Sequence, residues 1–506
     1  MERKMKSQSE TVPEHIHRRP AEKVGPSFAI GERTLPRFHC CKGKFQLFGH
    51  YVHAQFLLLL AVELLLVTVA SHFTLKAAVP WLYPADVPVP LRETLLASVL
   101  SLMAMVALGL YDTRQREQAM GIAFRMLSAF FLASLVLWAY YQINTNNLWD
   151  LKRHLVFLGT ALPLLAVTRI LFYRYIDGKV LLRRTLVLGT GKRARHIDRL
   201  RRRADKRGFH LVGFLAPRSC EAVHVDPARV VTAKEGFCDY SLSRNVDEIV
   251  IAVDDRRQKL PIDELLDCRM SGIEVIDAID FFEREMALIH LDLVQPGWLI
   301  HARGFKRNLA RDILKRSFDM AVSLVLLILS SPISLFTALA IWLEDRGKGG
   351  IFYRQERVGL NGEPFEVIKF RSMRPDAEAD GKARWAQKED PRVTRTGAFI
   401  RKYRIDEIPQ LWNVLRGDMS LVGPRPERPQ FVEHLVQLNP LYRERHRVKP
   451  GLTGWAQLSY PYGSSDRDAM QKLQYDLYYI KNASLFFDLL ILMQTVEVVL
   501  FRKGAR

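Results

Sequence analysis

Four apolar segments between residues 55 and 173 constrain the fold of this 506-residue chain more than any other feature. The segments cover residues 55–75, 94–111, 120–141 and 155–173. Each is close to the length of about 20 residues that a helix needs to cross a bilayer. Burial as core helices of a soluble protein is the alternative, but four such segments joined by short loops are hard to bury in that way. The sequence therefore predicts a four-helix transmembrane region over residues 51–176.

The charge of the chain indicates an anionic partner. Its formal net charge is +20 at pH 7, which is typical of proteins that meet nucleic acid, an anionic membrane surface or phosphorylated substrates. The apolar segments favour the membrane and exclude a nucleic-acid partner. Lysine and arginine are dense before the first segment and after the fourth but sparse in the first loop, so both ends are predicted to be cytoplasmic. Arg125 and Arg169 lie inside apolar segments and receive no functional role.

Residues 1–50 are polar and basic, with scattered prolines. They have no apolar region followed by a small-residue cleavage site, so they do not resemble a signal peptide. We expect a disordered cytosolic tail. The five cysteines, Cys40, Cys41, Cys220, Cys238 and Cys268, form no CxxC pair, and reduced cytosolic thiols are expected.

Apolar runs alternate with helix-like pieces from residue 183 to about residue 300. Runs at 185–189, 211–215, 248–252 and 272–276 read as buried parallel strands, and residues 262–270 read as a helix between two of them. This rhythm predicts a Rossmann-like domain of the type that binds CoA or NAD. Gly189 and Gly191 mark a possible nucleotide-binding turn. No clear ribose-binding acid follows, and Asp205 precedes the second strand, so a structural or regulatory domain is the favoured interpretation.

A fifth apolar run covers residues 318–343 and follows a basic linker at residues 300–312. Ser331 and Pro332 interrupt this run near its middle, where proline removes a backbone donor and kinks a helix. Both flanks are basic, so a helix that enters the membrane and returns to the same face satisfies the charge pattern and the break. A full crossing is the alternative. A last apolar run, residues 483–501, is predicted to lie at the membrane interface rather than to cross.

Two adjacent carboxylates, Asp406 and Glu407, precede a helix-like run at residues 408–415 and are surrounded by arginines. A carboxylate can attack phosphorus and carry a phosphoryl group, and a neighbouring carboxylate can hold Mg²⁺. Arginines neutralise charge on a transferred phosphoryl group. Acidic residues at a helix start are also common for a simpler reason, because they cap free N–H groups and complement the helix dipole.

Ordered sequence blocks across the C-terminal third resemble the bacterial sugar transferase family, the monotopic phosphoglycosyl transferases. The blocks are KRSFD at 315–319, FYRQERVG at 352–359, KFRSM at 369–373, RVT at 392–394 with Gly397, DEIPQLWN at 406–413, GDMSLVGPRP at 417–426, KPGLTGW at 449–455 and YDLYY at 475–479. Together with the preceding segments, the chain is similar to the long members of that family, which transfer hexose 1-phosphate to undecaprenyl phosphate. The implied fold class is a membrane protein, α plus α/β, with a mostly helical catalytic domain at residues 313–506.

The resemblance implies a ping-pong reaction that begins exopolysaccharide, O-antigen or capsule synthesis. Asp406 would attack the β-phosphate of a UDP-sugar, release UMP and carry the phosphosugar until undecaprenyl phosphate accepts it. Glu407 would hold Mg²⁺ together with Asp406. The implied location is the bacterial inner membrane, multi-pass, with the catalytic domain on the cytoplasmic face among the membrane lipids. The sequence does not fix the oligomeric state, for which a homodimer is one option, and glucose is our choice over galactose as the sugar.

The resemblance also assigns further residues to the site. Phosphate or substrate binding is implied for Lys369, Arg371, Arg401, Arg404, Arg425 and Asp476. Lys315, Arg316 and Asp319 would receive the lipid phosphate and secure the membrane break at Ser331 and Pro332. Each assignment has a simpler alternative: Lys315 and Arg316 as interface anchors, Lys369 and Arg371 as exposed strand residues, and Asp476 as a plain ion-pair partner.

Two other functions fit parts of the sequence. A membrane nucleotide-sugar dehydratase or epimerase would also join membrane spans to a Rossmann-like domain, but it needs a second dinucleotide-binding fingerprint and a Tyr-x-x-x-Lys pair. The pair Tyr175 and Lys179 lies ahead of the first predicted strand and is taken as chance. A non-catalytic scaffold for polysaccharide assembly is the third candidate, and it would have no need for Asp406 and Glu407 with their arginines.

Overall fold

A computed structural model gives the fold. It describes residues 44–47, 50–82, 91–111, 119–143, 151–172, 174, 182–200, 208–216, 222–233, 236–255, 260–294, 298, 302, 304–305, 309–346, 349–374, 392–460, 463 and 465–501. The predicted tail before residue 44, the cysteines Cys40, Cys41 and Cys220, Asp205, and the Tyr175–Lys179 pair lie outside the described residues.

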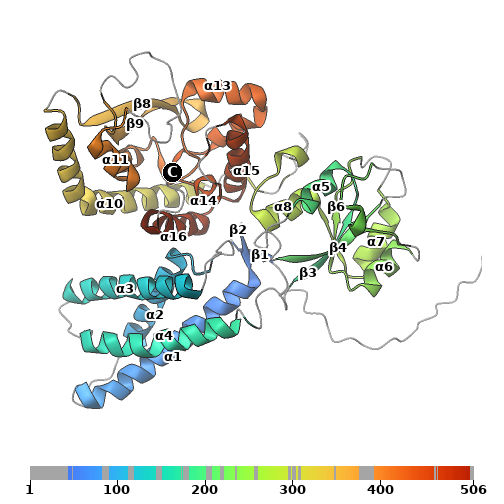
Figure 1. Ribbon diagram of the computed structural model, residues 1–506, viewed down its shortest axis with the longest axis horizontal. Helices are drawn as coiled ribbons and strands as arrows, with labels where there is room; N and C mark the ends of the chain where they lie inside the picture. The colour runs from blue at the N-terminus through green and yellow to red at the C-terminus, as the bar shows by residue number, and fades with distance from the viewer. Residues whose placement is uncertain are drawn as a thin grey trace, which may run out of the picture. The chain divides into compact units, whose positions relative to one another are not determined.

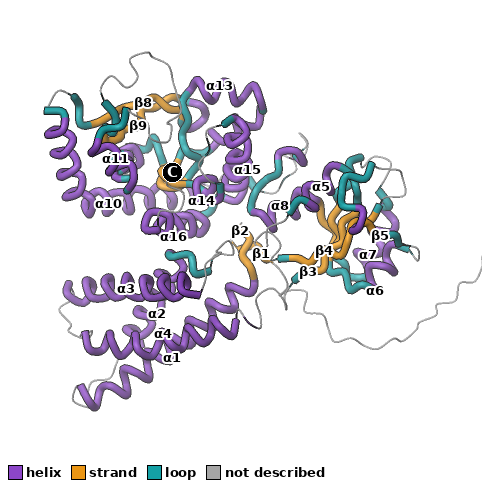
Figure 2. Tube along the Cα trace, in the orientation of Figure 1, coloured by secondary structure: helices purple, strands orange, loops and turns teal. Residues whose placement is uncertain are grey.

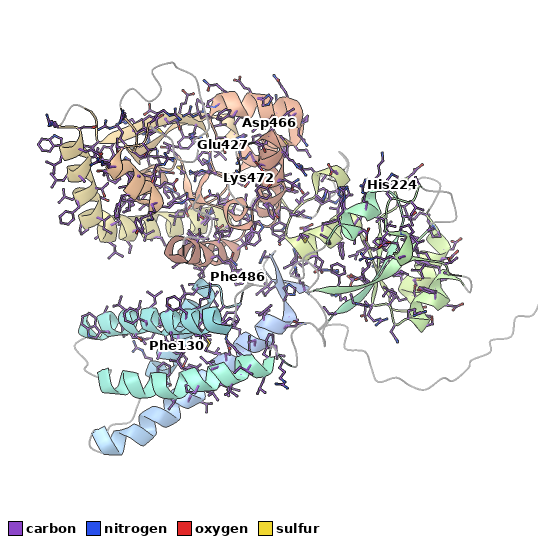
Figure 3. The ribbon with its side chains drawn as sticks, in the orientation of Figure 1. Phe130, His224, Glu427, Asp466, Lys472 and Phe486 are labelled. Carbon is purple, nitrogen blue, oxygen red and sulfur yellow. The ribbon has the colours of Figure 1, made fainter. Side chains whose placement is uncertain are left out.

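Four helices occupy the four predicted apolar segments: α1 (Ala54–Leu82), α2 (Leu91–Ala107), α3 (Ala119–Ile143) and α4 (Leu151–Leu171). Figure 1 shows them side by side. Their facing sides bury mainly alanine and leucine, with methionine and phenylalanine residues that include Phe130, which is labelled in Figure 3. Within the described residues, α3 over residues 121–140 and a later helix are long and apolar enough to cross a membrane, whereas α1, α2 and α4 contain shorter apolar stretches.

A buried cluster of polar side chains binds the backbone just after the C-terminal end of α2. Arg169 of α4 donates to the carbonyl of Leu110 at 2.9 Å and forms an ion pair with Glu63 of α1, also at 2.9 Å. Arg125 of α3 donates to the carbonyl of Leu108 at 2.5 Å. The last carbonyls of a helix have no partner within it, so the two arginines supply donors to the chain that leaves α2. The structure thus gives Arg125 and Arg169 a role that the sequence alone does not reveal.

A strand pair and a parallel sheet follow the order of the chain. β1 (Lys44–Leu47) and β2 (His50–His53) pair antiparallel, so ordered structure begins inside the stretch predicted as a disordered tail. β3 (Arg183–Leu188), β4 (Phe209–Leu215), β5 (Val230–Val231), β6 (Glu248–Ile251) and β7 (Glu274–Asp277) form one parallel sheet in the order β5-β4-β3-β6-β7.

Helices cover both faces of this sheet (Figure 2). Val187 and Val250 pack with α5 (Lys192–Asp198) and α8 (Ala278–Met286) on one face. Leu186 and Leu188 pack with α6 (Phe237–Ser243) and α7 (Ile262–Met270) on the other. Successive strand residues point to opposite faces, which explains why a short, wholly apolar run is buried on both sides. The bounds of α7 coincide with the predicted helix, whereas β5 has no predicted counterpart.

The fifth apolar run lies within α10 (Leu309–Glu344), a 36-residue helix. The helix begins within the predicted basic linker, so that linker is shorter than predicted because Leu309 to Asp312 already form a helical turn. Figure 1 shows α10 turning sharply between its two parts. Pro332 has no N–H for the carbonyl of Ile328, and the hydroxyl of Ser331 donates to that carbonyl at 2.8 Å instead. The Ser-Pro pair therefore bends the helix while keeping this carbonyl hydrogen-bonded.

The rest of the chain folds against both ends of α10. β8 (Phe352–Val358) and β9 (Pro364–Phe370) form an antiparallel hairpin, and β10 (Ser420–Val422) pairs parallel with β11 (Gly451–Thr453). The helical elements are α11 (Arg395–Lys402), η7 (Ile405–Glu407), α12 (Gln410–Arg416), α13 (Pro429–Leu438), η8 (Pro440–Arg447), α14 (Trp455–Ser459), α15 (Asp466–Asn482) and α16 (Leu485–Phe501). Ile341, near the end of α10, packs with Phe370 and Ile400.

Candidate active site

The carboxylate pair lies in a single 3₁₀ turn. Asp406 and Glu407 belong to η7, which connects α11 to α12. Arg404 enters the turn with a φ of 60°, a left-handed conformation that is uncommon for a residue with a Cβ atom. Such conformations cost free energy and concentrate at functional sites. The turn places Glu407 inside the protein and leaves Asp406 half-buried.

Three cationic side chains surround Glu407. Arg425 lies 2.9 Å from its carboxylate, Arg404 3.4 Å and Lys369 3.5 Å. Burial by itself would raise the pKa of Glu407, but the three cations together lower it well below its ordinary value. Glu407 is therefore ionised across the neutral range, and it holds the three cations together beside its neighbour. Burial lowers the pKa of Lys369, and Glu407 opposes that shift.

Asp406 differs from its neighbour in its contacts. Within the described part of the chain, its carboxylate forms no hydrogen bond and no ion pair. Burial, followed by the negative charge of Glu407, raises the pKa of Asp406 to about 6, although Lys369, Arg401 and Arg425 act in the opposite direction. Asp406 is therefore a carboxylate with free lone pairs, mostly ionised at neutral pH, beside a cluster of cations. That is the electronic situation of an activated oxygen nucleophile.

Close backbone packing fixes the loop that carries Arg425. A Cβ atom on Gly423 would lie 2.4 Å from the carbonyl oxygen of Lys449, and one on Gly451 would lie 2.0 Å from the amide nitrogen of Gly423. Gly423 donates to the carbonyl of Thr453, and Gly451 donates to that of Pro424, both at 2.9 Å. The glycines therefore let the β10 and β11 segments lie in contact, and this contact holds the following loop in place.

A buried arginine, which sequence reasoning did not identify, supports the same loop. Arg445 of η8 donates to the backbone carbonyl of Arg425 at 2.9 Å and lies 3.0 Å from the carboxylate of Asp476. Arg445 and Asp476 are almost fully buried. Tyr442 is buried as well, and its hydroxyl accepts a hydrogen bond of 2.5 Å from Arg445. Asp476 is thus one step removed from the carboxylate pair, and it acts on the site through Arg445 and Arg425.

The remaining predicted cations occupy different places. Arg401, in the last turn of α11, acts on Asp406 through its charge. Arg371 follows β9, is nearly buried and pairs with Asp345 just after α10. Glu344, the last residue of α10, accepts the amide of Arg395 at 2.9 Å. The structure therefore places Arg371 at the C-terminal end of α10, where it forms an ion pair with Asp345 rather than with Asp406 or Glu407.

The three residues near the start of α10 fasten that helix to the domain. Lys315 pairs with Asp488 of α16 at 2.7 Å. Arg316 donates to the carbonyls of Val414 and Leu415 at the end of α12, at 2.5 and 2.7 Å. Asp319 accepts from the hydroxyl of Ser420 at 2.8 Å. Asp319 thus anchors α10 to β10, and within the described residues it forms no hydrogen bond with Ser331 or with the bend at Pro332.

A carboxylate of the protein itself binds the backbone amides that follow the turn at Gly189 and Gly191. The amides of Lys192 and Arg193 both donate to the carboxylate of Asp254, each at 2.8 Å. Gly189 has a φ of 126°, and a Cβ atom there would lie 2.5 Å from the carbonyl oxygen of Ala252. The glycine is needed where β3 and β6 end, and Asp254 takes amides that a pyrophosphate would use. A nucleotide at this turn stays a prediction.

The donor set at the carboxylate pair suits magnesium through Asp406. Mg²⁺ prefers oxygen ligands and is usually held by one or two carboxylates plus substrate phosphates. Asp406 offers an unpaired carboxylate of this kind, whereas the oxygens of Glu407 already face three cations. Among the residues that the structure describes, no third His, Cys, Asp or Glu joins the pair. A magnesium ion would therefore draw most of its ligands from a bound diphosphate and water.

Comparison with known proteins places these residues in a family. The profile described as Bacterial sugar transferase matches residues 310–502. A relative from Erwinia amylovora, described as UDP-galactose-lipid carrier transferase, is 31% identical over 390 residues, which are 72% of this chain and 78% of the relative. The chain belongs to the bacterial sugar transferase family. The family resemblance predicted from the sequence blocks is confirmed.

Two further relatives match the catalytic region alone. An N-acetylgalactosaminephosphotransferase from Aeromonas hydrophila, described as acting on UDP-N-acetylgalactosamine and undecaprenyl phosphate, is 46% identical over 193 residues. A UDP-glucose:undecaprenyl-phosphate glucose-1-phosphate transferase from Escherichia coli K12 is 43% identical over 195 residues. Each match covers 38% of this chain and less than half of the relative, 45% and 41%. The named sugars differ among these family members.

Proposed function

We propose that this bacterial sugar transferase is a phosphoglycosyl transferase that moves a hexose 1-phosphate from a UDP-sugar to undecaprenyl phosphate. The observation that carries the proposal is the contrast between the two adjacent carboxylates. Glu407 is paired with cations on three sides, while Asp406 beside it is unpaired. The descriptions of the relatives support the same class of reaction. They name glucose, galactose and N-acetylgalactosamine, and glucose remains our choice.

The proposed reaction has two displacements at the β-phosphorus. An oxygen of Asp406 forms a bond to that phosphorus as the bond to the bridging oxygen breaks, and UMP departs with the electron pair. An oxygen of undecaprenyl phosphate then attacks the same phosphorus, and the Asp406 carboxylate leaves. The products are UMP and undecaprenyl diphosphate-sugar, which would start exopolysaccharide, O-antigen or capsule synthesis. Magnesium, when bound, would neutralise charge on the diphosphate.

The protein's own cations would do the remaining work. Arg425, Lys369 and Arg404 are held by Glu407 within reach of one another and would contact the phosphate oxygens as negative charge shifts during the displacement. Fixed cations of this kind lower the barrier because they need no reorganisation when the charge develops. Arg401 would add a further positive charge near Asp406.

The proposed location is the bacterial inner membrane. Helices α1 to α4 would cross it, residues 183–300 would form a Rossmann-like domain, and α10 would enter and return with the catalytic domain on the cytoplasmic face. Contacts at both ends of α10 support the re-entrant arrangement. Asp319 bonds to Ser420 near one end, and Ile341 packs with Ile400 near the other. The part between these contacts exposes Leu326, Leu329, Leu335 and Phe336.

The test is UMP release by the full chain from a panel of UDP-sugars with undecaprenyl phosphate and Mg²⁺. We expect release with one or a few sugars, and none from Asp406→Asn or Asp406→Ala. Lys402→Gln, at an exposed position of the same region, should remain active and serves as the matched control. Substantial activity of either Asp406 variant would refute its role. Absence of UMP with every sugar would favour the scaffold function.

A further inference from the structure

Three side chains with metal-binding atoms meet away from the carboxylate pair. His196 lies in α5, His290 directly precedes η5 (Leu291–Leu293), and Asp292 lies in η5. Nε2 of His196 is 3.8 Å and Nδ1 of His290 is 3.9 Å from the same oxygen of Asp292. All three ligand atoms lie within 4.8 Å of one another. Within the described residues, this is the one such group of three.

One atom of the group lacks the partner that burial requires. Nδ1 of His290 is buried and forms no hydrogen bond with any described residue. A buried polar atom without a partner costs free energy, because its hydrogen bonds to water are lost and not replaced. Asp292, in contrast, is 71% exposed. The group therefore combines a buried ligand atom on His290 with an exposed carboxylate on Asp292, so an ion can enter from solvent.

The ligand types select a class of ion. Two imidazoles and one carboxylate suit borderline transition metals, Zn²⁺ above all, whereas Mg²⁺ and Ca²⁺ prefer oxygen ligands alone. Zinc binds nitrogen at about 2.0–2.1 Å in a tetrahedral arrangement. The three ligand atoms must therefore move together by roughly 1 Å from their present spacing, and the exposed Asp292 has the freedom to do so.

We propose that His196, His290 and Asp292 form a binding site for one divalent transition-metal ion, with Zn²⁺ as the best match and water in the remaining coordination position. The site would act structurally. Ile289, the residue before His290, donates its amide to the carbonyl of Gln474 in α15 at 3.1 Å. A bound ion would therefore tie α5, on one face of the parallel sheet, to a segment that already contacts the sugar transferase region.

The experiment is zinc titration of the tag-free full chain in detergent after removal of metal by chelation. We expect one Zn²⁺ per chain, and His196→Gln or His290→Gln should weaken binding about tenfold or more. The matched control is His210→Gln, at an exposed histidine of β4 outside the group. Co²⁺ substitution supplies a spectroscopic readout: the intense visible bands of tetrahedral cobalt should appear in the native protein and be absent from the His290 variant.

Two further measurements keep the proposal open to refutation. Asp406→Asn protein should bind Zn²⁺ as tightly as the native chain, because the proposed site is separate from the carboxylate pair. Zinc should also raise the melting temperature of native protein and of His210→Gln, but not that of His290→Gln, since a ligand that binds only the folded state stabilises it. Binding below one equivalent, or equal affinity in the histidine variants, would overturn the proposal.

Discussion

Arg425 lies 2.9 Å from the carboxylate of Glu407, the residue next to the candidate nucleophile Asp406. The arginine thus neutralises the neighbour and leaves the carboxylate of Asp406 without an ion pair in the described structure. A basic side chain paired with Asp406 itself would have to move away before an oxygen of Asp406 could attack the phosphorus. The arrangement separates two tasks that adjacent carboxylates would otherwise share: one orders the cations, and the other stays free to react.

The pH dependence of the reaction should report the raised pKa of Asp406, which is about 6. Because attack needs the ionised carboxylate, the rate of UMP release should be nearly constant above pH 7 and fall about tenfold per pH unit below pH 6. The measurement is kcat/KM for the UDP-sugar between pH 5 and pH 8. An acidic limb centred near pH 4, the ordinary range of an aspartate, would contradict the proposed environment of Asp406.

Glu407→Gln should shift that acidic limb to lower pH. The negative charge of Glu407 raises the pKa of Asp406, so its removal lowers the pKa. The variant should also lose about 10²-fold in kcat at neutral pH, because Arg425, Lys369 and Arg404 lose their common partner and their geometry. The matched control is Glu433→Gln, an exposed residue of α13. An unshifted limb would show that Glu407 does not act on Asp406 through its charge.

Arg445 and Asp476 should control activity by positioning Arg425. Removing one partner of a buried ion pair leaves an uncompensated charge and destabilises a protein by about 3–5 kcal/mol. Asp476→Asn should therefore lower both the melting temperature and kcat. Arg445→Lys keeps the charge but loses the hydrogen bond to the Arg425 carbonyl at 2.9 Å. This variant should therefore lose kcat, while its melting temperature falls less than that of Asp476→Asn. The exposed Arg447→Gln is the control. Native kcat in Arg445→Lys would refute the positioning role.

Both ends of α10 should lie on the same side of the membrane. In a cysteine-free background, Asp312→Cys places an exposed thiol in the first turn of α10, and Gly350→Cys places one beyond the end of the helix. Gly350 has room for a Cβ atom, since its nearest atom would be 3.5 Å away. Membrane-impermeant maleimide should label both thiols in inside-out vesicles and neither in intact cells. Labelling from opposite sides would show that α10 crosses the bilayer.

Pro332→Ala should straighten α10. The new amide can donate to the carbonyl of Ile328, which now receives the hydroxyl of Ser331, and the reason for the bend disappears. The Gly350→Cys thiol should then lose its protection from the outside of intact cells, or the protein should fail to accumulate. Ser330→Ala is the control, because its hydroxyl bonds to the carbonyl of Leu327 rather than to that of Ile328.

Sequence reasoning succeeded where local pattern determines structure. The apolar run before Gly189 is a strand buried on both faces, and residues 262–270 are the helix α7. Asp406 and Glu407 are adjacent in the chain, so their proximity can be predicted without knowledge of the tertiary structure. The sequence did not indicate which carboxylate takes the cations, because that depends on where Lys369 and Arg425 lie in space.

Long-range pairs account for most of what the sequence did not reveal. Glu63 and Arg169 are 106 residues apart, and Arg184 and Asp247 are 63 apart. In neither case does the sequence around the two residues predict that they form a contact. Arg445 lies in a run rich in arginine, where one buried residue cannot be told from its exposed neighbours. The role of Asp254 is also a long-range one, because this residue follows β6 and accepts hydrogen bonds from amides of α5 that lie about 60 residues earlier in the chain.

The central claim is a covalent phosphosugar on Asp406, and intact-protein mass spectrometry tests it most directly. Native chain mixed with the accepted UDP-sugar and Mg²⁺, without undecaprenyl phosphate, should gain the mass of one hexose phosphate and release one equivalent of UMP. The added mass should map to the peptide that contains Asp406 and disappear when undecaprenyl phosphate is added. UMP release that strictly requires undecaprenyl phosphate, with no labelled peptide at any time, would contradict the account.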